Sequence, residues 1–115
     1  MSKEAIVFVR HVIDSIENIE SFTKGVTKAD FMKNKEKQSA VVHQIEIIGE
    51  AAKNIPKEFK QKYPFIAWND IIRTRDKITH HYFGVDLNIV WDIVKKDLPK
   101  LKKNISQILR KEIGS

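Results

Sequence analysis

The chain has 115 residues, 42% of them hydrophobic and 31% charged, so it is long enough to bury one core without disulfide or metal support. It contains no cysteine, which excludes a disulfide framework, a thiolate metal cage and a cysteine nucleophile, and fits a reducing compartment such as the cytoplasm. The formal net charge of +6 favours anionic partners. The longest apolar run covers only residues 5–9, so we expect a soluble single domain over residues 1–115.

Apolar residues recur with the helical period through the first half of the chain. A first helix is predicted over 2–23, because one face of it carries Ile6, Val9, Ile13, Ile16 and Ile19. Thr27 and Asp30 have the spacing of a capping box and predict a short helical turn around Phe31. A long second helix is predicted over 35–54.

The second half continues the helical pattern. Pro56 and Pro64 bracket a short helical or turn segment, and a third main helix is predicted over 65–83. Asp86 is placed to cap the last helix, which Pro99 is expected to kink. We therefore predict an all-α protein, an antiparallel bundle of four long helices plus one or two short ones.

The segment RDKITHHYF, residues 75–83, places ionisable groups within the apolar pattern of the third predicted helix. Arg75 falls where two apolar rows of that helix meet, and a buried guanidinium is costly unless it is paired. We therefore expect Arg75 to face either a cleft that holds an anion or a carboxylate, for which Glu46 and Glu50 are the candidates. A purely structural ion pair between helices stays open as the alternative.

His80 lies five residues after Arg75, about 140° around an ideal helix and about 7.5 Å along it. The two side chains can meet at one phosphate only if their length bridges that gap, the helix end deforms, or a second protomer supplies half of the site. Asp76 precedes His80 by four residues, so on a helix it would orient the imidazole for acid–base chemistry. The alternative for His80 is an ordinary polar helix end.

Read as RxxxxHxY, this motif, together with IIGEAA at 47–52 and HYFGVDLNIVWDIVKKDLPKL at 81–101, resembles the HepT-like toxins of the HEPN superfamily. The resemblance implies a helical bundle that dimerises so that two motifs line one cleft, and a ribonuclease that needs neither metal nor cofactor. It implies that Arg75 binds the scissile phosphate, that His80 is the acid or base and that Tyr82 completes the site. Asp76 and Glu50 are the expected supporting residues.

The same resemblance implies a partner. In HepT pairs, a nucleotidyltransferase of the MntA type is the antitoxin and attaches AMP to the motif tyrosine, which is Tyr82 here. The added phosphates would occupy the space between Arg75 and His80 and repel an RNA backbone. Two other functions stay open: a catalytically weak module that docks the transferase and is modified by it, and a basic helical DNA-binding protein.

Three weaker patterns have simpler explanations. His43, Glu46 and Glu50 share a helix face and could be read as metal ligands, although a polar seam facing Arg75 explains them better. Residues 95–111 hold seven basic residues and one acidic residue, which suits an RNA backbone, an acidic antitoxin face or simply a solvated helix face. No exposed aromatics are interleaved with these cations in the sequence. Trp68 and Trp91 fit the core stripes.

Overall fold

The computed structural model describes residues 3–80 and 84–114, with the backbone alone for Thr79 and His80. The described chain is all-α apart from two short strands, which confirms the predicted fold class. The elements in chain order are α1 (Lys3–Thr23), α2 (Lys28–Lys33), α3 (Lys35–Asn54), α4 (Lys57–Lys62), α5 (Trp68–Ile72), α6 (Thr74–Ile78), β1 (Thr79–His80), β2 (Gly84–Val85), α7 (Leu87–Asp92), the π-helical turn η1 (Ile93–Asp97) and α8 (Leu98–Ile113).

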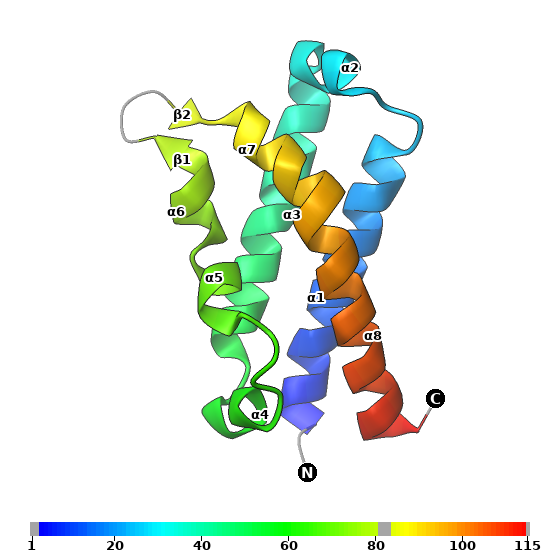
Figure 1. Ribbon diagram of the computed structural model, residues 1–115, viewed down its shortest axis with the longest axis vertical. Coiled ribbons are helices and arrows are strands. Elements are labelled where there is room, and N and C mark those ends of the chain that lie inside the picture. Colours follow the sequence, from blue (N-terminus) through cyan, green and yellow to red (C-terminus); the bar gives the residue numbers. More distant parts are fainter. Residues whose placement is uncertain (1–2, 81–83, 115) are drawn as a thin grey trace.

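Helix α3 forms the centre of the bundle. It packs against α1 on one side and against α5 and α6 on the other, while the continuous run from α7 through η1 to α8 crosses in front of α3 and packs on α1 (Figure 1). The core is built from apolar side chains of all these elements. None of the described helices is long and apolar enough to span a bilayer.

The stripe of α1 that faces the core is rotated slightly from the predicted one. Val9, Ile16 and Ile19 are buried as expected, but Ile6 and Ile13 are only partly buried. Residues on the adjacent sector take their place in the core, namely Ala5, Val12, Ser15 and Thr23. The helix itself ends at Thr23, as predicted.

Short polar side chains start the helices where the sequence predicts. The backbone N–H of Asp30 donates to Thr27 Oγ1 at 3.1 Å and that of Thr27 donates to Asp30 Oδ2 at 3.3 Å, so the capping box before α2 is confirmed. Helix α2 buries Phe31, whose ring centroid lies 5.2 Å from that of Trp91. Asp86 Oδ1 accepts the backbone N–H groups of Asn88 and Ile89, which confirms the cap of α7.

The sequence predicts a kink at Pro99, and the structure has a wider turn of the helix directly before it. Proline has no N–H to donate to the carbonyl four residues earlier, so the regular ladder is interrupted there. The π-helical turn η1 comes immediately before, and Pro99 occupies the first turn of α8. The long C-terminal run therefore continues across the proline instead of ending at it.

The prediction of a third main helix over 65–83 is wrong. Two short helices replace it: α5 ends at Ile72, α6 begins at Thr74, and β1 follows directly after Ile78. Strand β1 pairs antiparallel with β2, with Thr79 opposite Val85 and His80 opposite Gly84. The chain thus leaves the helical path before it reaches the second half of the RxxxxHxY motif.

Candidate functional site

The break between α5 and α6 is stabilised by polar side chains at the junction. Thr74 Oγ1 donates to the carbonyl of Asp70 at 2.9 Å. The carbonyl of Asn69 accepts the backbone N–H of Arg73 at 3.0 Å, and Arg73 Nε lies 3.4 Å from the same oxygen. These bonds satisfy carbonyls in the last turn of α5, which would otherwise lack donors at a helix end. The two motif-bearing helices are therefore separate elements with a defined junction.

Gly49 on α3 lets this junction approach closely. A Cβ at position 49 would lie 3.4 Å from the carbonyl oxygens of both Ile71 and Ile72. A methyl would just fit in that space, but a branched side chain would push against the backbone of α5. The glycine of the IIGEAA segment thus sets the distance between α3 and the end of α5, from which the motif helix α6 starts.

Arg75 lies on α6 and its side chain is not buried, contrary to the prediction. The side chain is 73% exposed, and Nε lies 3.2 Å from Glu46 Oε2, whose side chain is 39% exposed. Of the two carboxylates predicted as partners of Arg75, both of them among the described residues, Glu46 forms the ion pair and Glu50 does not. An ion pair this exposed contributes at most about 1 kcal/mol to stability, so the guanidinium is only loosely held. It can exchange the carboxylate for another anion at little cost.

The predicted helical relation between Asp76 and His80 is also wrong. Asp76 is exposed on α6, but α6 ends at Ile78 and His80 belongs to β1, so the two residues are not one helical turn apart. The gap of about 140° between Arg75 and His80 does not apply either, because it assumed a continuous helix. Of the three conditions under which the motif residues could meet, a deformed helix end is present, because α6 ends at Ile78 and His80 lies in β1.

The remaining predicted residues are placed as follows. Tyr82, and His81 beside it, lie outside the described residues. Glu50 is exposed on α3, and its carbonyl accepts a bond from Asn54 Nδ2 at 2.9 Å. No group of three or more metal-ligating side chains lies within the described residues, so His43, Glu46 and Glu50 form no metal site in this part of the chain.

Asp86 ties the end of the motif segment to the C-terminal helices. Its backbone N–H donates to the carbonyl of Ile78 at 2.6 Å, and its carboxylate caps α7. Ile78 is fully buried, so the last residue of α6 is fixed both by its side chain and by its carbonyl. The motif arginine therefore sits on a short helix that is anchored immediately after it.

The basic segment 95–111 is less uniformly charged than its sequence implies. Lys96 lies 3.9 Å from Asp92, and Lys102 lies 2.8 Å from Glu20. Two further ammonium groups lie over aromatic rings, Lys95 over Trp91 at 4.9 Å and Lys111 over Tyr63 at 5.9 Å. The cations of this segment that form no ion pair or ring contact with any described residue are Lys100, Lys103 and Arg110.

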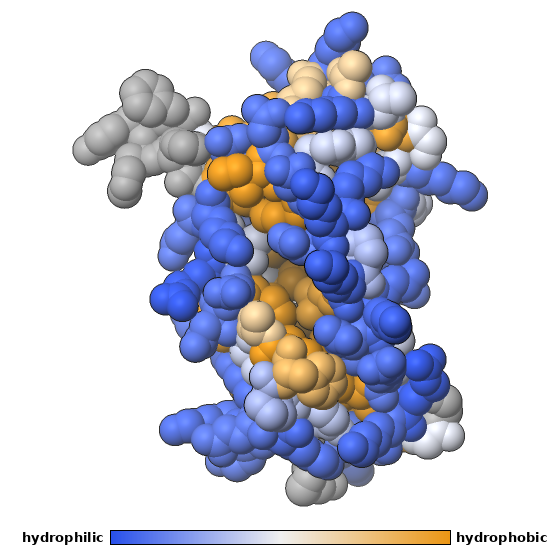
Figure 2. All heavy atoms as spheres, viewed as in Figure 1, coloured by the Kyte–Doolittle hydropathy of each residue, from blue (hydrophilic) through white to orange (hydrophobic). Residues whose placement is uncertain are grey.

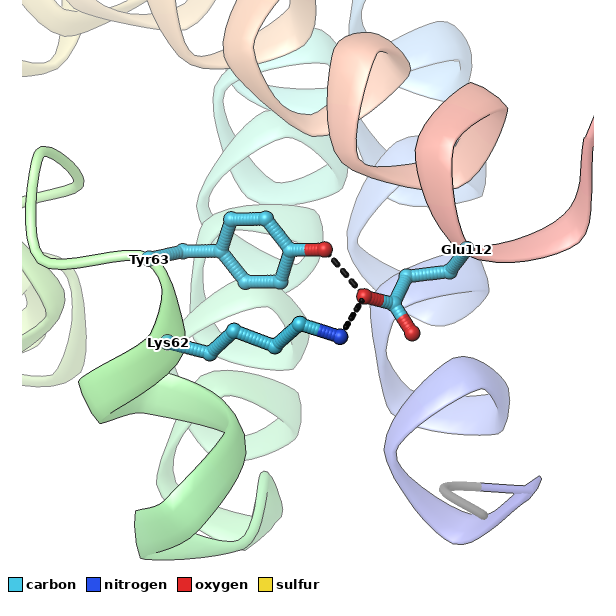
Figure 3. A network of polar contacts seen from close by, with 3 residues as sticks. All are labelled: Lys62, Tyr63 and Glu112. Atoms are coloured by element: carbon cyan, nitrogen blue, oxygen red, sulfur yellow. Dashed lines mark hydrogen bonds and ion pairs between the residues drawn. The ribbon is translucent and has the colours of Figure 1, made fainter.

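A buried tyrosine links α4 to the end of α8, and sequence reasoning missed it. Tyr63 Oη donates to Glu112 Oε2, and Lys62 Nζ lies 2.6 Å from the same oxygen (Figure 3). Burial raises the pKa of Tyr63 to about 12, and the hydrogen bond to the Glu112 carboxylate adds to the effect. The carbonyl of Tyr63 also accepts Trp68 Nε1 at 3.0 Å. The start of α5 is thus fixed by the same residue.

The chain is similar in sequence to a protein family and to several known proteins. A family described as "Ribonuclease HepT-like" matches residues 12–108. A gamma-glutamylcyclotransferase and proposed RNase of Methanocaldococcus jannaschii is 48% identical over 109 residues, 95% of this chain and 49% of that protein. A "probable ribonuclease HepT" of Thermococcus cleftensis is 44% identical over 101 residues, 88% of this chain and 92% of that one. A proposed RNase of Caldanaerobacter subterraneus subsp. tengcongensis is 40% identical over 105 residues, 91% of this chain and 94% of that one.

The chain thus spans about half the length of the M. jannaschii relative and nearly all of the other two. No solved structure matches it significantly. The fold and the motif place the protein in a class of small helical proteins of HEPN type. The chain belongs to the ribonuclease HepT-like family.

Proposed function

We propose that this protein is a metal-independent endoribonuclease, the toxin of a toxin–antitoxin pair. The observation that carries the proposal is the position of Arg75, an exposed guanidinium held by one weak surface ion pair on α6, a helix that is anchored at Ile78. Because this ion pair contributes little to the stability of the fold, the guanidinium of Arg75 is free to bind a phosphate. Relatives from three organisms are named as RNases or proposed RNases, which supports RNA as the substrate.

The proposed chemistry needs three elements. Arg75 binds the scissile phosphate and stabilises the charge that develops on it. His80 acts as acid or base on the ribose 2′-hydroxyl or the leaving oxygen, and Tyr82 completes the site. A 2′-hydroxyl that attacks its own phosphate requires positioning and proton transfer but no metal, so this route also explains a preference for RNA over DNA.

Two copies of the chain are proposed to place their motifs in one cleft. The geometric argument for a dimer assumed that Arg75 and His80 lie on one continuous helix. That argument no longer applies, because His80 lies in β1. The resemblance to HEPN dimers is the remaining support. Glu46 is proposed to hold Arg75 when no substrate is bound, because its carboxylate occupies the position that a phosphate oxygen would take.

The direct test is RNA cleavage by purified protein in the presence of EDTA. We expect wild-type protein to cut RNA with the chelator present and His80→Ala to lose at least about a hundredfold in rate, the size typical of a missing acid or base. Activity that EDTA abolishes would overturn the metal-free mechanism. If wild-type protein cuts no RNA yet binds a nucleotidyltransferase tightly, the rival function as a modified binding module is favoured.

The proposed partner is a nucleotidyltransferase of the MntA type that attaches AMP to Tyr82. We expect coexpression with such an enzyme to add the mass of one AMP group to the protein and to suppress cleavage, because the added phosphate competes for Arg75. The Tyr82→Phe variant is the control and should gain no mass. An AMP-sized increment that persists in Tyr82→Phe would contradict the assigned acceptor.

A further inference from the structure

An apolar groove runs between the motif helices and the C-terminal run. Its floor is formed by Ile45 and Ile48 of α3, one wall by the segment from Phe65 to α6 and the other by η1 and α8. Figure 2 shows it as a hydrophobic hollow framed by hydrophilic side chains. Its volume of about 290 Å³ is at the lower end of the range for small-molecule sites, enough for a group the size of one nucleotide.

Polar groups of several kinds line the rim. Lys77 lies on one wall and Lys100 on the other, and neither ammonium forms an ion pair with a residue that the structure describes. Asp97 of η1 and Asn104 of α8 lie on that second wall, and Asp70 of α5 lies on the first. Carboxylate and amide groups can pair with the edge of a nucleobase, and ammonium groups can hold its phosphate.

Phe65 provides an aromatic surface at this groove. Among the described residues it is one of the few large hydrophobic ones that are exposed, at 58%, and its ring packs edge-on against Tyr63 with centroids 6.2 Å apart. The buried Tyr63 therefore holds an otherwise exposed ring in place. Aromatic rings held beside cations are the elements from which proteins build stacking sites for single-stranded nucleic acid.

The groove adjoins the motif directly. Thr74 and Lys77 line it, and Arg75 follows Thr74 on the same short helix, about 100° around on the side away from Lys77. Helix α6 thus presents Lys77 and Thr74 to the groove, and Arg75, beyond Thr74, to Glu46 and solvent. A nucleotide whose base enters the groove would carry its phosphate toward the sector occupied by Arg75.

We infer that this groove binds one nucleobase of the RNA strand, stacked on Phe65, next to the phosphate that Arg75 holds. The inference rests on the proposed function and adds a base-binding subsite to it. RNA fits better than a second copy of the chain because the groove combines an apolar interior, base-pairing groups and cations without an ion-pair partner among the described residues. A nucleotide carries the matching parts: apolar faces, polar edges and a negative charge.

The test is equilibrium binding of a fluorescent single-stranded oligoribonucleotide with 2′-O-methyl riboses, which cannot be cut by 2′-hydroxyl attack. We expect Phe65→Ala to weaken binding about tenfold, as loss of one stacked base does, and Phe65→Trp to restore it. Lys100→Ala should weaken binding and reduce its dependence on salt. The matched control is Val7→Ala, which shortens another exposed apolar side chain, on α1 and outside the groove, and should change nothing.

Equal affinities for wild type and Phe65→Ala would overturn the inference. It would also be overturned if Phe65→Ala left RNA affinity intact but dissociated an oligomer in sedimentation, since the groove would then be an interface between copies. Free AMP, GMP, CMP and UMP distinguish the source of the base: if they alone bind in a Phe65-dependent way, the groove serves free nucleotides and the assignment to an RNA strand is overturned.

The failure of this inference and that of the proposed function can be told apart. Phe65-dependent binding without any cleavage of an unmodified oligoribonucleotide would support the groove and reject the nuclease. Cleavage that needs His80 but is identical in wild type and Phe65→Ala would support the nuclease and reject the groove.

Discussion

At the residue scale, Tyr63 is fixed through its ring, its hydroxyl and its carbonyl. Its ring is buried, its hydroxyl donates to Glu112, and its carbonyl accepts Trp68 Nε1. Removing one partner of a buried hydrogen bond leaves the other unsatisfied at a cost of about 1–3 kcal/mol. Glu112→Ala should therefore lower the free energy of unfolding, measured by chemical denaturation, more than the loss of an exposed ion pair such as that between Lys102 and Glu20.

The pKa of Tyr63 gives this contact a pH signature. Because the fold raises the pKa of Tyr63 from 10 to about 12, the stability contributed by its neutral form is complete below pH 10 and is lost as pH rises toward 12. We expect the single tyrosine of folded Tyr82→Phe protein to ionise near pH 12 in an absorbance titration. The additional Glu112→Gln change should lower that midpoint. A midpoint near 10 in the folded protein would contradict the burial and bonding of Tyr63.

Glu112 shows the opposite dependence. Its hydrogen bonds with Lys62 first, and then with Tyr63, lower the pKa of the carboxyl below its ordinary value of 4.5. The stability contributed by its ionised form is therefore present above about pH 4.5 and is lost as pH falls through the lowered pKa.

At the element scale, the α5–α6 junction decides where the motif lies, and local sequence did not reveal it. Residues 65–83 contain neither glycine nor proline, so helical periodicity ran through them without interruption. Besides the local bonds of Arg73 and Thr74, the break is accompanied by contacts with residues outside it: the close approach of α5 to Gly49, and the pairing of β1 with β2. The local signals were sufficient for α2 and α7, because Thr27 and Asp86 cap helices through neighbours two or three residues away.

Substitutions at Gly49 test this explanation. Gly49→Ala should change stability by less than about 1 kcal/mol, since a methyl just fits and alanine favours the helix. Gly49→Val should cost about 1–3 kcal/mol by overpacking, because its extra carbons meet the carbonyls of Ile71 and Ile72. Chemical denaturation of both variants measures the difference. Equal stability of the alanine and valine variants would show that α5 does not rest on α3 at this point.

At the scale of the whole molecule, the sequence predicted the all-α class and most helix bounds but not the surfaces. Phe65 and Lys100 are 35 positions apart in the sequence, and nothing in the sequence indicates that they line one groove. The tertiary structure brings them together by placing α5 and α8 on either side of it. The same holds for charge. Segment 95–111 reads as uniformly basic, yet Glu20 and Asp92 neutralise two of its lysines in the fold.

The position of Arg75 shows the same limit. Apolar neighbours in the sequence placed it at the core, because that argument assumed one straight helix. In the fold, α6 is a separate element whose buried residue is Ile78, and Arg75 is turned toward Glu46 and solvent. The residue type and the motif were enough to single out Arg75 as a candidate, while its burial and its partner geometry required the tertiary structure.

We propose that Arg75 binds a phosphate and contributes little to the stability of the fold. Comparing RNA cleavage and unfolding free energy in Arg75→Ala and Glu46→Ala tests it most directly, because both changes remove the same ion pair. We predict that each variant stays within about 1 kcal/mol of wild-type stability, that Arg75→Ala loses cleavage and that Glu46→Ala keeps it. Equal loss of cleavage in both variants, or full cleavage by Arg75→Ala, would contradict the claim.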